Sequence, residues 1–89
     1  MKYFHGRLEE INGEREYSYD YLIKAKSLEE ASQRLSAEAS GFYGADAMPV
    51  SGTDDAFEFF NGEIFVRVDS IGQTTKAQFV KHMLQKCEI

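Results

Sequence analysis

The chain has 89 residues, which is enough for one hydrophobic core and too few for two, so we expect a single domain. Hydrophobic residues make up 43% of the chain and charged residues 28%, the balance of a folded globular protein rather than a disordered one. Ten basic residues against 15 acidic ones give a net charge of −5, which argues against nucleic acid or an anionic membrane as a direct ligand.

Cysteine usage and hydropathy predict the compartment. Cys87 is the only cysteine, so no intrachain disulfide can form, as is typical of a reducing environment. The first residues lack the apolar stretch of a secretory signal, and no apolar run is long enough to span a bilayer. We therefore expect a cytoplasmic protein.

The first predicted element is a β-hairpin that turns at Asn12-Gly13. Asn-Gly accepts the positive φ that both central positions of a type I′ turn require, and it is the strongest short-range hairpin signal. A turn at this dipeptide places Leu8 opposite Tyr17, and side-chain alternation then assigns each residue to a core face or an outer face of the sheet. The predicted core face holds Phe4, Gly6, Leu8, Tyr17, Tyr19, Tyr21 and Ile23, and the outer face holds Tyr3, His5, Arg7, Glu9, Glu16, Ser18, Asp20 and Leu22.

A helix is predicted to begin after Ser27. The segment Ser27-Leu-Glu-Glu30 matches a capping box, in which the serine side chain covers an orphan amide of the first turn and the glutamate reaches back. Gly41 is expected to end the helix in the left-handed conformation. Apolar residues recur every three or four positions, as on an amphipathic helix: Leu28, Ala31, Leu35, Ala39 and Phe42.

Residues 41–55 form a long connection that holds three of the seven glycines and the only proline. Most loops in compact domains run to about 4–6 residues, and longer ones on a rigid scaffold often carry function. The favoured alternative is a covering segment that packs Phe42, Tyr43 and Met48 against the helix.

Asn61-Gly62 predicts a second type I′ hairpin, with Phe59 opposite Ile64. Its core face holds Phe57, Phe59, Ile64, Val66 and Val68, and its outer face holds Glu58, Phe60, Phe65, Arg67 and Asp69. A second capping box, Thr75-Lys-Ala-Gln78, begins a final helix. The predicted apolar stripe of that helix is Ala77, Val80, Met83, Leu84 and Cys87.

Two hairpin–helix units, residues 1–41 and 55–89, are thus joined by loop 42–54. This order predicts an α+β fold, a two-layer ββαββα sandwich with a four-stranded antiparallel sheet and both helices on the core face. The outer face would stay uncovered, and large apolar groups on it can form a binding patch or a homodimer contact. The alternative is a set of singly exposed aromatic residues. The predicted protein-binding residues are Tyr3, Leu22, Phe60, Phe65 and Arg67.

The chain offers little catalytic chemistry. His5 and Asp20 are predicted to lie opposite each other and could orient a general base, but no nucleophile is evidently placed beside them, so a polar cross-strand pair is favoured. His82 and Cys87 are poorly spaced for a metal, and no nucleotide-binding glycine loop occurs. We expect no enzymatic activity, no cofactor and no metal. The glutamates near the first turn are predicted to form a solvated hairpin end: Glu9, Glu10, Glu14 and Glu16.

The function we expect is that of a small acidic protein-binding module that acts through the exposed sheet face or the 41–55 loop. In size, acidity and lack of catalytic residues the chain resembles many small accessory proteins of phages, plasmids and other mobile elements. Some of those proteins inhibit host defence machinery stoichiometrically. The resemblance implies an alternative function, an inhibitor that blocks a host defence protein or mimics its nucleic acid.

Overall fold

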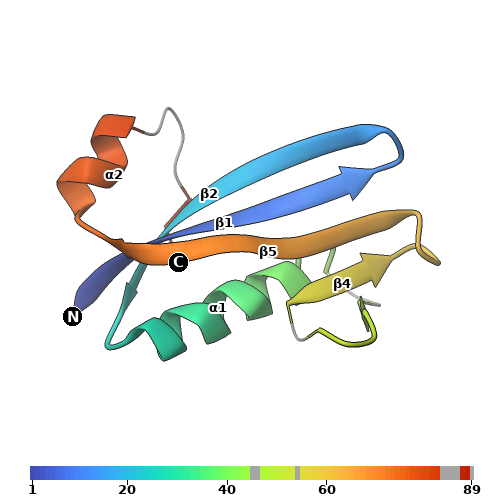
Figure 1. Ribbon diagram of the computed structural model, residues 1–89, viewed down its shortest axis with the longest axis horizontal. Helices are drawn as coiled ribbons and strands as arrows, with labels where there is room; N and C mark the ends of the chain where they lie inside the picture. Colours follow the sequence, from blue (N-terminus) through green and yellow to red (C-terminus); the bar gives the residue numbers. More distant parts are fainter. Residues whose placement is uncertain (45–46, 54, 83–86, 89) are drawn as a thin grey trace.

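A long antiparallel sheet forms the frame of the protein, which the computed structural model describes over residues 1–44, 47–53, 55–82 and 87–88. The elements in chain order are β1 (Lys2–Asn12), β2 (Arg15–Ala25), α1 (Leu28–Ser40), β3 (Met48–Pro49), β4 (Ala56–Phe59), β5 (Ile64–Thr74), α2 (Lys76–His82) and β6 (Cys87–Glu88). Five strands pair in the antiparallel order β3-β4-β5-β1-β2, and the short β6 joins the free side of β2 in parallel orientation (Figure 1). The predicted α+β class is confirmed, whereas the prediction of four strands is wrong, because the two short strands β3 and β6 extend the sheet at its edges.

The first hairpin turns one residue later than predicted. Its central residues are Gly13, with φ 64°, and Glu14, which does not have a positive φ. This is the pattern of a type II′ turn, with glycine at the first central position, rather than of a type I′ turn. Leu8 consequently pairs with Tyr19 and not with Tyr17. The register moves by two residues, and because side chains alternate with a period of two, the predicted faces are unchanged.

The second hairpin has the predicted register, with Phe59 opposite Ile64. Asn61 and Gly62 have φ of 58° and 85°, as the two central residues of a type I′ turn should. Phe60, which precedes them, also has a positive φ, of 54°. Both hairpin turns lie at the same end of the sheet, which we call the turn end (Figure 1).

Helix α1 covers the core face, as predicted. Ser27 is its N-cap, since the Ser27 Oγ accepts a hydrogen bond of 3.2 Å from the backbone N–H of Glu30. Ala31, Leu35 and Ala39 are buried. Leu35 lies directly over Gly6 of β1, where an added Cβ would be only 2.7 Å from the Leu35 Cδ2.

The ends of α1 differ from the prediction in two respects. Leu28, expected in the buried stripe, is half exposed at the first position of the helix. Gly41 caps the other end with φ −95°, outside the left-handed region, and its N–H donates to the carbonyl of Ala37. The helix therefore ends where predicted but without the expected glycine conformation.

A β-bulge at Asp69 changes the alternation of β5. Val68 and Ser70 pair with consecutive residues of β1, so Asp69 is an extra residue in the strand. Val68 and Ile71 consequently both pack against the core although they are three positions apart. The bulge lets one strand of 11 residues serve the core on both sides of the break.

Helix α2 lies on the outer face, so the prediction of two helices on one face is wrong. Phe79 is buried, and its ring centroid is 5.2 Å from that of His5, an outer-face residue of β1. Leu22, the cross-strand partner of His5, is 0% exposed on the same face. An apolar side chain such as Leu22 on the outer face is buried only if another element packs on that face. Helix α2 lies over this end of the sheet (Figure 1).

The apolar stripe predicted for the last helix is also wrong. The Thr75 cap is confirmed, because its Oγ1 accepts a hydrogen bond of 3.1 Å from the N–H of Gln78. The side chain that α2 buries is Phe79, however, while Ala77 and Val80 are exposed. Cys87 belongs to β6 and not to the helix, and two further predicted members, Met83 and Leu84, lie outside the described residues. Neither α1 nor the described part of α2 has the length and apolarity that crossing a bilayer requires.

The second turn can be tested by substitution. Gly62→Val should lower the free energy of unfolding by about 1–2 kcal/mol, because a β-branched residue resists the positive φ of this position. Gly72→Val is the matched control, since Gly72 lies in β5 without a positive φ and has open space around the position of a Cβ. Thermal denaturation followed by circular dichroism measures both. Equal losses in the two variants would contradict the turn assignment.

The position of α2 can be tested in the same way. Phe79→Ala should lower the free energy of unfolding by about 3 kcal/mol, because it opens a cavity on the outer face. Val80→Ala, the neighbouring change on the exposed side of the helix, should stay within about 0.5 kcal/mol of the wild type. If Val80→Ala proved the more harmful in urea denaturation, the predicted stripe would be right and the helix would pack differently.

Candidate functional site

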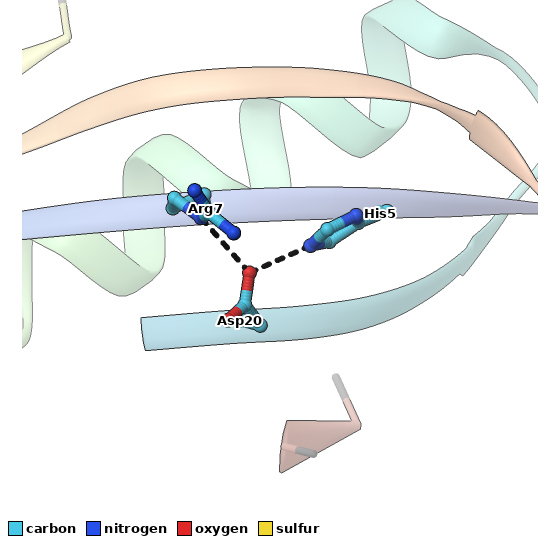
Figure 2. A network of polar contacts seen from close by, with 3 residues as sticks. All are labelled: His5, Arg7 and Asp20. Carbon is cyan, nitrogen blue, oxygen red and sulfur yellow. Dashed lines mark hydrogen bonds and ion pairs between the residues drawn. The ribbon is translucent and has the colours of Figure 1, made fainter. Parts of the chain in front are cut away.

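A polar network occupies the middle of the outer face (Figure 2). The Oδ1 of Asp20, on β2, accepts hydrogen bonds from the Nε2 of His5 at 2.7 Å and from the Nε of Arg7 at 3.0 Å. His5 and Arg7 are neighbours on the outer face of β1, so both side chains converge on the one carboxylate. The predicted contact between His5 and Asp20 is thus confirmed, although it is diagonal, because Arg7 is the direct cross-strand partner of Asp20.

The electrostatics of the network favour an ionised aspartate. Partial burial of Asp20 opposes ionisation, but the hydrogen bonds from His5 and Arg7 outweigh it and hold the pKa of the carboxyl below its ordinary value. Because an ionised carboxylate only accepts hydrogen bonds, the contact requires a proton on the Nε2 of His5. The ring of His5 also packs edge-on against Phe79. These contacts tie β1, β2 and α2 together, which is a structural role.

A second ion pair neutralises a predicted binding residue. Arg67 donates from both Nε and Nη2 to the Oε1 of Glu9, at 3.0 and 2.7 Å, across the β5–β1 pairing. The hydrogen bond to Glu9 and the charge of that carboxylate raise the pKa of Arg67. Arg67 is exposed, as predicted, but its guanidinium already has a partner.

The predicted apolar patch on the outer face does not form one surface. Leu22 is wholly buried, so the prediction that it is exposed on this face is wrong. Tyr3 and Phe65 are half-buried and lie toward opposite ends of the outer face, since Phe65 of β5 pairs with Ile11 of β1 and Tyr3 precedes Ile11 by eight residues in β1. At about 3.3 Å per residue they are roughly 26 Å apart. Phe60 is exposed, as predicted, but it contacts a different set of side chains.

Phe60 belongs to a chain of aromatic rings at the turn end. Its ring centroid is 5.4 Å from that of Tyr43, in an edge-to-face arrangement. Tyr43 contacts Phe42 and the buried Phe59 in the same geometry, each at 5.2 Å, and Phe42 contacts Tyr19 at 5.0 Å. We call the exposed pair, Tyr43 and Phe60, with Phe42 and Phe59 beneath it, the aromatic surface. Edge-to-face contacts of this kind add roughly 0.5–1.5 kcal/mol each beyond the area they bury.

Residues of the 41–55 loop match only in part the prediction of a covering segment. Phe42 packs against the core, as predicted for a covering segment. Tyr43 is 38% exposed and Met48 is 62% exposed, so neither is covered. Tyr43 and Phe60 belong to separate predicted elements, and no pattern in the sequence indicates that their rings meet. The positive φ of Phe60, which directs its ring toward the loop, has no signal in the sequence.

The chain of aromatic rings reaches Tyr19, whose hydroxyl is hydrogen-bonded to a buried carboxylate on the core face. Glu10 is 3% exposed and accepts a hydrogen bond of 2.7 Å from the hydroxyl of Tyr19. Burial, together with the hydrogen bond to Glu10 and its negative charge, raises the pKa of Tyr19 to about 12. The solvated hairpin end predicted from the four glutamates is therefore wrong for Glu10, while Glu14 and Glu16 are exposed.

Two further observations describe the composition of this region. The His5 network contains no serine, threonine or cysteine. Within the described part of the chain, no three His, Cys, Asp or Glu side chains are grouped so as to hold a metal ion. Comparisons with protein-family models, with curated proteins and with solved structures gave no match to this chain.

The Asp20 network predicts a pH dependence of stability. Because the pKa of Asp20 is lower in the folded state than in the unfolded chain, its contribution is present above the unfolded pKa, about 4, and is lost as the pH falls through the folded pKa. The stability difference between wild type and Asp20→Asn should therefore shrink as the pH falls from 5 toward about 2. Urea denaturation at a series of pH values measures this difference. Asp69→Asn, at an exposed position of β5, is the control, and a difference for Asp20→Asn that stayed constant with pH would refute the assignment.

Proposed function

We propose that this protein is a small non-enzymatic protein-binding module and that its partner docks on the aromatic surface. The observation that carries the proposal is Phe60, a bulky residue that has φ 54° while its side chain is 56% exposed. Residues other than glycine, asparagine and aspartate rarely adopt this conformation, which costs on the order of 1–2 kcal/mol. Because more than half of the Phe60 side chain stays exposed, the area that it buries does not offset this cost. Stability alone therefore does not explain a phenylalanine at this position.

Strained residues with exposed apolar side chains are characteristic of functional surfaces. Phe60 does not stand alone, because its ring rests on Tyr43, which rests in turn on the buried Phe59. Aromatic residues supported in this way are the usual anchors of protein interfaces, since they bury a large area and lose little side-chain entropy. The aromatic surface thus has the composition and the rigidity of an interface centre.

The aromatic surface also joins two regions that the sequence analysis proposed separately. Tyr43 comes from the 41–55 loop, and Phe60 is one of the predicted sheet-face residues. The rest of the predicted patch supports binding less well, since Leu22 is buried and Arg67 is already paired with Glu9. Phe65 is half-buried on the outer face and defines the competing location.

The proposal is tested by Phe60→Asn. Asparagine tolerates a positive φ, so this change removes the ring while relieving the backbone. We expect a melting temperature that is unchanged or raised, together with loss of the partner in affinity capture from the native host. Leu28→Asn is the matched control, because Leu28 is similarly exposed at the start of α1 and should keep the partner.

Phe65→Asn separates the two candidate locations. If the aromatic surface is the interface, this outer-face variant should still capture the partner that Phe60→Asn loses. Capture by Phe60→Asn together with loss by Phe65→Asn would place the interface on the outer face and refute the proposal. A lower melting temperature for Phe60→Asn would show that the ring serves stability instead.

A further inference from the structure

The negative charge of the protein is concentrated in the segment that builds the aromatic surface. Residues 35–66 include Phe42, Tyr43, Phe59 and Phe60 but contain no lysine or arginine. The same segment carries six acidic residues, namely Glu38, Asp46, Asp54, Asp55, Glu58 and Glu63. The remainder of the chain holds all ten basic residues and nine acidic ones, a charge of +1, against −6 for this segment.

Two of these acidic residues, Glu58 and Glu63, belong to the hairpin that carries Phe60. Glu63 closes the turn, since its N–H donates to the carbonyl of Phe60 at 3.3 Å. The Oε2 of Glu58 lies 3.8 Å from the position of a Cβ on Gly62, so this carboxylate lies over the turn. Among the described residues neither glutamate has an ion-pair partner, and the nearby Arg67 is bound by Glu9.

Building on the proposed function, we propose that the aromatic surface binds a cationic segment of a partner protein through an arginine side chain. A guanidinium can lie flat on the exposed ring of Tyr43 or Phe60, and the carboxylates of Glu58 and Glu63 in the same hairpin attract its positive charge. An apolar partner would instead desolvate these carboxylates without compensation, and burial of an unpaired charge costs several kcal/mol. A nucleic acid would be repelled by the same charges.

Arginine fits this surface better than lysine for two reasons. Its planar guanidinium stacks on an aromatic face, whereas an ammonium group makes only a point contact and is more strongly hydrated. Because the guanidinium has five N–H donors, it can also donate hydrogen bonds to a carboxylate while its flat face lies on a ring. The charge of −6 carried by residues 35–66 adds a long-range attraction that accelerates encounter with a basic partner and that salt screens.

Three synthetic peptides of equal length provide the probe: glycine-serine repeats with arginine, lysine or glutamine at the same positions. Their binding to the full chain is measured by fluorescence anisotropy and mapped by amide chemical shifts in NMR spectra. We expect affinity in the order arginine, lysine, glutamine, and shifts centred on Tyr43 and residues 58–63. The affinity of the arginine peptide should fall as salt is added.

Variants divide the two contributions. Phe60→Asn or Tyr43→Ala should weaken the arginine peptide about 2- to 5-fold, as expected for one lost cation–π contact, and should narrow its advantage over lysine. Glu58→Gln or Glu63→Gln should weaken both cationic peptides alike and flatten the salt dependence. Glu29→Gln is the matched control, because Glu29 is an exposed carboxylate in the first turn of α1, and it should leave all affinities unchanged.

Several outcomes would overturn the inference. Equal affinity for the arginine and glutamine peptides would do so, as would shifts centred on Glu14 and Glu16 of the first hairpin. Sedimentation showing that the chain associates with itself, and that Phe60→Asn abolishes this association, would make a second copy the occupant. If Phe60→Asn loses the native partner while no peptide prefers the aromatic surface, the proposed function stands and the cationic partner is refuted.

Discussion

The alternation of side chains along β1 is the constraint on which the rest of the structure depends. β1 pairs with β2 on one side and β5 on the other, so each of its residues is fixed to one face by two ladders of hydrogen bonds. Phe4, Leu8 and Glu10 are buried on the core face. Gly6 lies between them and leaves the space that Leu35 of α1 fills, which sets how closely the helix approaches the sheet. The residues of β1 that alternate with these lie on the outer face. Among them, His5 and Arg7 belong to the polar network, and His5 also contacts Phe79 of α2.

The faces of the sheet were predictable from the sequence because they depend only on parity. The register of the first hairpin was not, since Asn-Gly can supply either the central pair of a type I′ turn or the first glycine of a type II′ turn, and these differ by two residues. The side chosen by α2 was not predictable either. Among the described side chains of α2 only Phe79 is buried, and its contact with His5 appears only when the outer face is assembled.

The candidate site shows why parity fails in turns. Alternation continued through β4 places Phe60 on the outer face with Glu58 and Phe65. Its positive φ interrupts the strand and brings the ring to Tyr43, whose other neighbour is the core residue Phe59. A residue that leaves the strand conformation no longer obeys a period of two. The alternation of side chains therefore predicts correctly that Phe60 is exposed, but it predicts the wrong neighbours for Phe60, among them Leu22, which is buried.

The rigidity of the turn end connects this geometry to function. The type I′ turn at Asn61-Gly62 holds Phe60 by fixing the backbone that follows it, and the ladder of β4 and β5 fixes the backbone before it. Tyr43 is held by rings on both sides. A surface ordered before binding loses little conformational entropy on association, so more of its contact energy appears as affinity. On the outer face, Asp20 is paired with Arg7 and Glu9 with Arg67, whereas Glu58 and Glu63 of the second hairpin have no ion-pair partner among the described residues. The hairpin that presents Phe60 thus also carries two carboxylates without an ion-pair partner among the described residues, and the proposed cationic partner would use both features.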